Sequence, residues 1–136
     1  MLRPDSRLFI AVIAPLLIWP WVPAWDGGSY RDGVSEAIVL IVLAPIAEEI
    51  VFRGFVQGGL LRIARFRQIA LGISIANWTT SIVFAAAHGW QHPLTFLPGY
   101  LVVSVVLGYF RERYNGIRIP VLLHGYYNLG LWFFAS

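Results

Sequence analysis

Two adjacent glutamates lie within a long apolar stretch of the chain. Glu48 and Glu49 are followed by Arg53, and residues 37–61 otherwise carry almost no charge, as expected of a membrane-spanning helix. A charged side chain at bilayer depth costs roughly 2.5–3.5 kcal/mol on insertion scales and is tolerated mainly where it faces protein or water. The two carboxylates and the arginine therefore indicate a buried polar site.

The spacing within this stretch divides the roles of the two glutamates. On a helix, Glu49 and Arg53 share a face in the favourable order for an ion pair four residues apart. Because arginine keeps its charge in proteins, a buried Arg53 needs a carboxylate partner. Glu48 is rotated by roughly 100° and has no such partner in its own helix, so it is the candidate for chemistry. Pro45 is expected to kink the helix one turn earlier.

Polar side chains of two further apolar segments complete the candidate site. His88 follows Phe84 by one helical turn, and His124 and Asn128 are four residues apart on one helical face. A glutamate beside a histidine can take a proton from water as a general base. A second imidazole and a side-chain amide can donate hydrogen bonds to the oxyanion of a tetrahedral intermediate. This set of groups suits peptide-bond hydrolysis inside a membrane.

The composition predicts an all-α, polytopic membrane helix bundle. Of the 136 residues, 58% are hydrophobic and only 12% are charged, compared with about 25% charged in soluble domains. We expect one membrane-embedded domain over residues 1–136, with the motifs in a core of about 37–136 and about five transmembrane helices. The five apolar segments are residues 8–25, 34–61, 69–88, 97–110 and 119–134.

The arginines predict the orientation of the bundle. All ten basic residues are arginine, and nine of them lie outside the apolar segments. Loops with several arginines alternate with loops that have few or none. Arg3 and Arg7 precede the first segment, and two further clusters follow the second and fourth segments. By the positive-inside rule, the N-terminus is cytoplasmic and the C-terminus is outside, in a bacterial-type inner (plasma) membrane with the first segment retained as an anchor. The net charge of +3 forms no patch for nucleic acid.

The motifs resemble those of a known family. In order and form they are similar to the three motifs of the CPBP family, also called Abi, which includes type II CAAX prenyl endopeptidases and bacteriocin-processing membrane proteases. The resemblance covers about residue 37 to the C-terminus. The matching motifs are Glu48-Glu49-x-x-x-Arg53, Phe84-x-x-x-His88 and His124-x-x-x-Asn128.

This resemblance implies an intramembrane endopeptidase of the glutamic type, without a cofactor. It implies that Glu48 and His88 activate water, that His124 and Asn128 form the oxyanion hole, and that the ion pair of the first motif has a supporting role. The implied partners are the lipid bilayer and a membrane-anchored protein or peptide substrate. The short chain looks more like the small members linked to bacterial C-terminal sorting signals, of the JDVT-CTERM or myxosortase type, than like proteases of prenylated CAAX substrates.

Two other classes of protein remain open at this point. A zinc-dependent membrane protease could use Glu48, His88 and His124 as ligands, although the usual His-Glu-x-x-His helix is absent from the sequence. A proton-coupled transporter of small molecules could use Glu48 as a protonation switch. The absence of cysteine excludes disulfides and thiolate metal sites.

Overall fold

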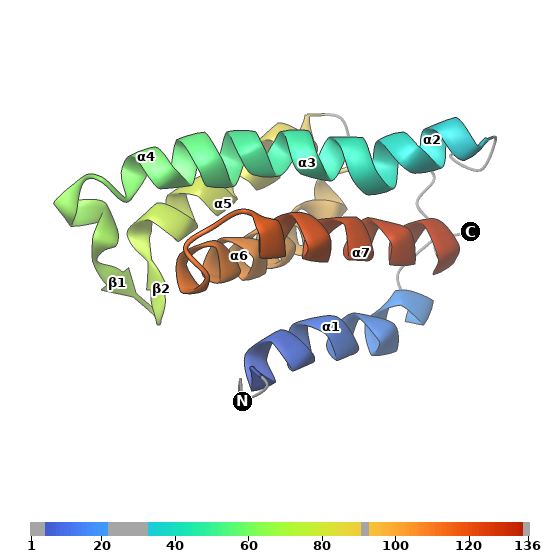
Figure 1. Cartoon of the computed structure of the whole chain (residues 1–136), viewed down its shortest axis with the longest axis horizontal. Helices are drawn as coiled ribbons and strands as arrows, with labels where there is room; N and C mark the ends of the chain where they lie inside the picture. Colours follow the sequence, from blue (N-terminus) through green and yellow to red (C-terminus); the bar gives the residue numbers. More distant parts are fainter. Residues whose placement is uncertain (1–4, 22–32, 91–92, 135–136) are drawn as a thin grey trace. The chain divides into compact units, whose positions relative to one another are not determined.

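The computed structural model of the chain describes residues 5–21, 33–90 and 93–134, with the side chain of Trp21 left out. These residues are almost entirely helical (Figure 1). They group into two compact units. The terminal unit comprises Met1–Pro45 and Leu122–Ser136, and the central unit comprises Ile46–Val121.

Five helical stretches follow the predicted apolar segments. The first is α1 (Ser6–Ile18) with the 3₁₀ turn η1 (Trp19–Trp21). The second runs without interruption through α2 (Val34–Ile38), the π-helical turn η2 (Val39–Leu43), α3 (Ala44–Glu49), the π-helical segment η3 (Ile50–Gln57) and α4 (Gly58–Leu60). The others are α5 (Ile75–Gly89), η5 with α6 (Leu94–Phe96 and Leu97–Arg113) and α7 (Arg118–Phe134).

The prediction of an all-α helical bundle is confirmed. Among the described residues, one helical stretch, Leu94–Arg113, is by itself long and apolar enough to cross a membrane. This fourth stretch is longer than the predicted residues 97–110, because η5 extends it at its start and α6 continues to Arg113 at its end. The end of the first predicted segment, residues 22–25, and Arg3 lie outside the described residues.

The third predicted segment begins later than its apolar sequence indicates. The prediction began at Ile69, whereas α5 begins at Ile75. A 3₁₀ turn, η4 (Ala64–Arg67), and a short antiparallel hairpin of β1 (Ile69–Ala70) and β2 (Ile73–Ser74) come first. Positive φ angles at Leu71 and Gly72 (55° and 79°) close this hairpin. The expected start was wrong because an apolar hairpin and an apolar helix have similar composition.

Ser74 fixes the start of α5. Its Oγ accepts a hydrogen bond from the backbone N–H of Asn77 at 2.9 Å, which makes Ser74 the N-cap of the helix. The indole N–H of Trp78 donates to the carbonyl of Ala70 at 2.9 Å and holds the hairpin against the same helix. The hairpin and the first turn of α5 are therefore one packed structure.

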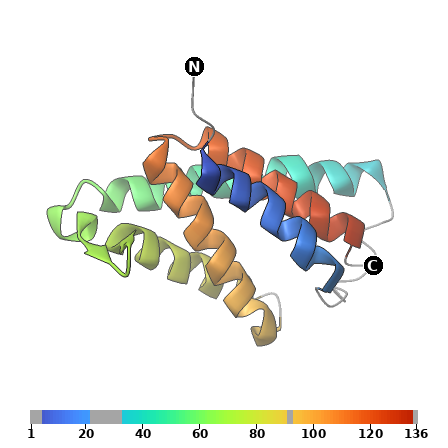
Figure 2. The ribbon, with the colours of Figure 1, turned by 90° about the horizontal axis from the view of Figure 1, so that it is seen from below.

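The helices α5 and α6 pack closely in the central unit (Figure 2). The side-chain amide of Asn77 donates to the carbonyl of Val105 at 3.0 Å and accepts a hydrogen bond from Ser81 at 3.0 Å. Gly108 lies directly against this amide, and a Cβ atom at that position would overlap the Asn77 side chain. Close approach of the two helices thus depends on glycine at position 108.

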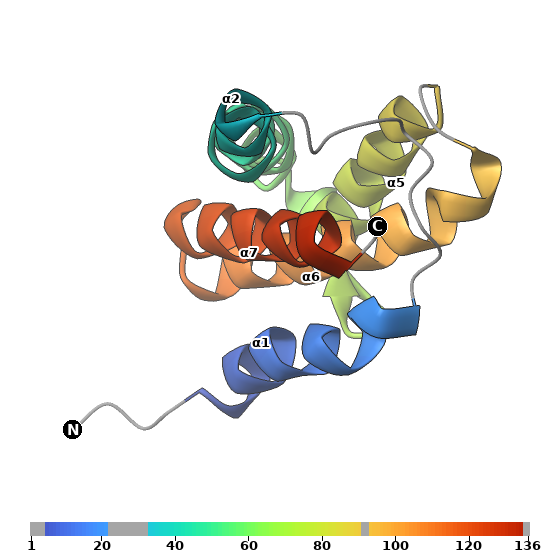
Figure 3. The same ribbon diagram turned by 90° about the vertical axis from the view of Figure 1, so that its right-hand side faces the viewer.

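In the terminal unit, α7 lies between α1 and α2 (Figure 3). The hydroxyls of Tyr126 and Tyr127 donate to the carbonyls of Val12 and Ala11 at 2.8 and 3.0 Å. The carbonyl of Ala11 is the one that Pro15 deprives of its usual backbone donor, because proline has no N–H. Tyr127 therefore replaces a hydrogen bond that α1 cannot make for itself.

Replacing Gly108 with alanine should destabilise the protein. The added methyl group would meet the Asn77 amide, and overpacking of this kind typically costs about 1–3 kcal/mol. The measurement is the thermal unfolding midpoint in detergent. Gly99→Ala, on the same helix with no atom within 4 Å of the added carbon, is the control and should leave the midpoint unchanged or slightly higher. Equal midpoints for the two variants would contradict the packing argument.

Candidate active site

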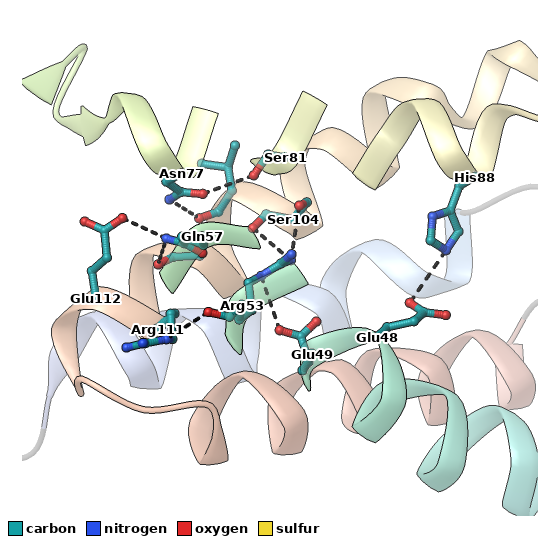
Figure 4. A network of polar contacts seen from close by, with 12 residues as sticks. Glu48, Glu49, Arg53, Gln57, Asn77, Ser81, His88, Ser104, Arg111 and Glu112 are labelled. Atoms are coloured by element: carbon teal, nitrogen blue, oxygen red, sulfur yellow. Dashed lines mark hydrogen bonds and ion pairs between the residues drawn. The ribbon is translucent and has the colours of Figure 1, made fainter. Parts of the chain in front are cut away.

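The two units divide the predicted site residues. The central unit carries the first two motifs, with Glu48, Glu49, Arg53 and His88. The terminal unit carries the third motif, with His124 and Asn128 on α7. Within the central unit, the structure brings the four predicted residues together as two pairs, each with its own surroundings (Figure 4).

The first pair joins Glu48 of α3 to His88 near the end of α5. Oε2 of Glu48 lies 3.7 Å from Nε2 of His88, which is ion-pair distance but longer than a direct hydrogen bond. Both side chains are partly exposed, at 29% for Glu48 and 21% for His88. Glu48 thus has its partner on another helix, although its Oε2 atom, which faces His88, has almost no exposed surface itself.

The other ring nitrogen of His88 determines which tautomer faces Glu48. Nδ1 lies 2.9 Å from the carbonyl oxygen of Phe84, one turn earlier in α5. Because a carbonyl oxygen only accepts hydrogen bonds, we assign the N–H to Nδ1. A neutral His88 then presents the lone pair of Nε2 to the Glu48 carboxylate. Two acceptors face each other, so the space between them favours a proton or a hydrogen-bond donor.

Two aromatic rings hold the imidazole of His88 in place. The Phe84 ring stacks on it with the centroids 4.2 Å apart, and the Tyr100 ring lies at 4.7 Å. The shared face of Phe84 and His88 was predicted from their spacing and is confirmed. Tyr100 was missed, because nothing in the sequence shows that the start of α6 passes the end of α5.

The second pair, Glu49 and Arg53, is fully buried. Nε of Arg53 lies 3.2 Å from Oε2 of Glu49, and both side chains have no exposed surface. The contact has the distance of an ion pair but lacks hydrogen-bond geometry. Nη2 of Arg53 donates to Oγ and to the carbonyl of Ser104, at 3.1 and 3.3 Å. The predicted contact four residues apart is therefore confirmed, and it belongs to the interior of the central unit.

The ring of Phe84 connects the two pairs. The guanidinium carbon of Arg53 lies 5.1 Å from the centroid of this ring, at cation–π distance. The same ring stacks on His88 and packs edge-on against Phe52 at 5.0 Å. Phe84 is only 1% exposed. Movement of the buried arginine would therefore disturb the packing of the histidine.

A row of polar contacts continues from Arg53 along η3 and α6. Nε2 of Gln57 donates to the carbonyl of Gly108 and to Oε1 of Glu112, at 3.1 and 2.7 Å. The Ser74 hydroxyl donates to the same carboxylate oxygen at 2.5 Å. Sequence analysis missed these residues, although Gln57 lies four residues after Arg53 on the same helix. These hydrogen bonds connect η3, which carries Arg53, to α6 and to the start of α5.

Metal ligands do not converge in the described part of the chain. No group of three His, Asp or Glu side chains there is arranged to hold a metal ion. Glu48 and His88 contribute two groups of the right chemistry in the central unit. The zinc alternative therefore depends on a direct test with chelators.

Comparison with known proteins gives the family of this chain. It matches the family of type II CAAX prenyl endopeptidase Rce1-like proteins over residues 31–130, a range that contains all six predicted site residues. Because the match covers most of the sequence, the chain belongs to this family of membrane-embedded proteases. The resemblance drawn from the three motifs is thereby confirmed at the level of the family.

Two curated relatives are similar over much of the chain. An uncharacterized 24.3 kDa protein of Escherichia coli is 33% identical over 99 residues, which are 71% of this chain and 42% of the relative. The uncharacterized protein YpbD of Bacillus subtilis (strain 168) is 26% identical over 129 residues, 88% of this chain and 60% of the relative. The chain thus spans about half the length of these relatives. No solved structure matches it.

The surroundings of the two glutamates predict that their substitution by glutamine changes the stability of the protein to different extents. Glu49→Gln would leave the fully buried Arg53 without its counter-charge, and breaking a buried pair from one side costs roughly 3–5 kcal/mol. Glu48→Gln keeps the shape of a partly exposed side chain and should unfold near the wild-type midpoint. The measurement is yield and thermal unfolding in detergent. A fully stable Glu49→Gln would show that the roles of the two glutamates are divided differently.

Proposed function

We propose that this protein is an intramembrane endopeptidase of the glutamic type that hydrolyses a peptide bond of a membrane-anchored protein. The observation that carries the proposal is the Glu48–His88 pair. It combines partial exposure, a 3.7 Å separation of two acceptor atoms and a histidine tautomer set by the Phe84 carbonyl. Membership of the Rce1-like protease family supports the same reaction class.

In this proposal, Glu48 and His88 act together as a general base. In the proposed mechanism, a water molecule donates one hydrogen to Nε2 of His88 and one to the Glu48 carboxylate. Because Oε2 of Glu48 has almost no exposed surface, its side chain must turn or the pair must open slightly to admit this water. In the proposed reaction, one proton moves to the pair as the water oxygen forms a bond to the carbonyl carbon of the substrate. The C–N bond then breaks, and the pair returns this proton to the leaving amine.

We propose that His124 and Asn128 stabilise the oxyanion formed in this reaction. Support comes from the order of the three motifs and from the family, and from the chemistry of the two side chains. An imidazole N–H and an amide N–H are both suitable donors to a developing negative charge. His124 is 5% exposed and Asn128 is partly buried, as expected of groups enclosed in a helical bundle.

Two kinds of substrate peptide are candidates, and one assay distinguishes them. The family name indicates a prenylated CAAX peptide, and a peptide with a C-terminal sorting signal is the second candidate. Two quenched fluorescent peptides in liposomes serve as probes. One ends in a farnesylated CAAX sequence, and the other ends in an apolar membrane segment followed by arginines. A transporter would cleave neither peptide.

Glu48→Gln should abolish most of the cleavage in this assay. It removes the base while keeping the shape of the side chain, and general-base catalysis contributes roughly 10²–10⁴-fold. The assay uses dialysed, chelator-treated protein, and wild type should keep its activity there. Glu36→Gln, at an exposed position of α2, is the matched control and should cleave like wild type. Loss of wild-type activity on chelation would favour the zinc protease, and full activity of Glu48→Gln would contradict the proposal.

Asn128→Ala should lower kcat by roughly 10²–10³, the range seen when one oxyanion donor is removed, with a much smaller change in KM. Single-turnover cleavage at matched folded concentration measures this effect. Tyr126→Phe is the control, because it also removes a side-chain hydrogen bond from α7 to a backbone carbonyl. It should cost stability but leave the rate constant unchanged. An unchanged rate in Asn128→Ala would remove the oxyanion role and leave the Glu48–His88 pair.

A further inference from the structure

The second helix departs from the α-helical hydrogen-bond pattern within η2. The backbone N–H of Ala44 donates to the carbonyl of Val39, five residues earlier, instead of to Leu40. The next residue, Pro45, has no N–H to donate. The carbonyl of Leu40 therefore has no backbone donor within its own helix, all of which the structure describes. The N–H of Ala44, four residues on, is bonded to Val39, and Pro45, five residues on, has no N–H.

A side chain of α7 supplies the missing donor. Nδ2 of Asn128 donates to the carbonyl oxygen of Leu40 at 2.9 Å. The nitrogen, and not the oxygen, of the amide must face this carbonyl, because two acceptors would repel. The amide group carries two N–H bonds in one plane. When one of them is held by Leu40, the direction of the second N–H is fixed.

The backbone of α7 also approaches this part of the second helix. A Cβ atom on Gly125 would come within 2.6 Å of the carbonyl oxygen of Ile41. The regular α-helical donor to that carbonyl, four residues on, would be Pro45. Pro45 therefore withholds an N–H from two successive carbonyls, from Leu40 as the residue five positions on and from Ile41 as the residue four positions on. Asn128 caps the first of them, and Gly125 lies against the second.

A similar arrangement occurs a second time in the terminal unit, at a position with no proposed part in chemistry, although there the proline lies four residues after the carbonyl instead of five. Pro15 leaves the carbonyl of Ala11 without its regular donor, and the hydroxyl of Tyr127 donates to it at 3.0 Å. Two neighbouring side chains of α7, at positions 127 and 128, thus cap carbonyls that prolines have freed. The Pro15 case shows the structural effect alone and serves as an internal comparison.

We propose that Pro45 is a positioning residue for the oxyanion donor. By freeing the carbonyl of Leu40, it creates the acceptor that orients the amide of Asn128 and directs its second N–H. This inference rests on the proposed function, in which Asn128 donates to the oxyanion. The feature that was predicted as a kink thereby acquires a role in aligning a side chain on another helix.

The first test is a double-mutant cycle in thermal stability, which does not depend on any activity. Pro45→Ala gives the helix an N–H, so Leu40 can be satisfied by its own backbone. Asn128→Ala should then lower the unfolding midpoint less in the Pro45→Ala background than in wild type. A parallel cycle of Pro15→Ala with Tyr127→Phe should show the same coupling. Equal shifts from Asn128→Ala in the two backgrounds would overturn the inference.

The second test separates positioning from stability. With the two liposome peptides as probes, Pro45→Ala should lower kcat by roughly 10–10²-fold with KM almost unchanged, because a small misalignment of a catalytic group has effects of this size. Pro15→Ala should leave both constants at wild-type values. If Pro45→Ala keeps the wild-type kcat, the positioning role is overturned. This holds even if the stability cycle shows that Pro45 and Asn128 are coupled. If wild type cleaves neither peptide, the proposed function fails and the positioning role fails with it, while the cycle still decides whether Pro45 sets the Asn128 contact.

Discussion

A permanently charged guanidinium with no exposed surface is the constraint on which the central unit depends. Arg53 cannot lose its proton, so its surroundings must compensate the charge. The Glu49 carboxylate, the Ser104 hydroxyl and carbonyl, and the face of Phe84 do so from three different helical segments. Because the Phe84 ring also stacks on His88, the packing that satisfies the arginine also sets the position of the candidate catalytic histidine.

The sequence predicted the parts of the site that depend on one helix. The pairing of Glu49 with Arg53 follows from helical spacing alone, and so does the shared face of Phe84 and His88. The spacing also left Glu48 without a partner in its own helix, and the structure supplies that partner from α5. The oxyanion role of the third motif stays a prediction.

Contacts between helices could not be predicted in the same way, because they depend on where each helix begins. The apolar residues 69–73 resemble the start of a membrane helix, yet they form a hairpin, and Ser74 determines where α5 begins. The register of α5 against α6 then places Tyr100 on His88. Gln57 and Glu112 were missed for the same reason, since their contact joins segments distant in the sequence.

The structural effect of a proline is also only partly predictable from the sequence. The absence of an N–H at Pro45 is visible in the sequence and predicts a disturbance of the helix. The form of that disturbance, a π-helical turn at η2, and the identity of the replacement donor are tertiary properties. Asn128 could be recognised as a member of a motif, but its acceptor on another helix could not be named.

The close approach of Gly108 to Asn77 has an evolutionary consequence. The amide of Asn77 occupies the space that any side chain at position 108 would need. A larger residue at 108 is therefore accessible only after a smaller one has replaced Asn77, and the reverse order passes through a destabilised protein. The order in which the two positions change therefore matters during evolution. In an alignment of proteins that descend from this chain, we expect positions 77 and 108 to change together or both to be kept.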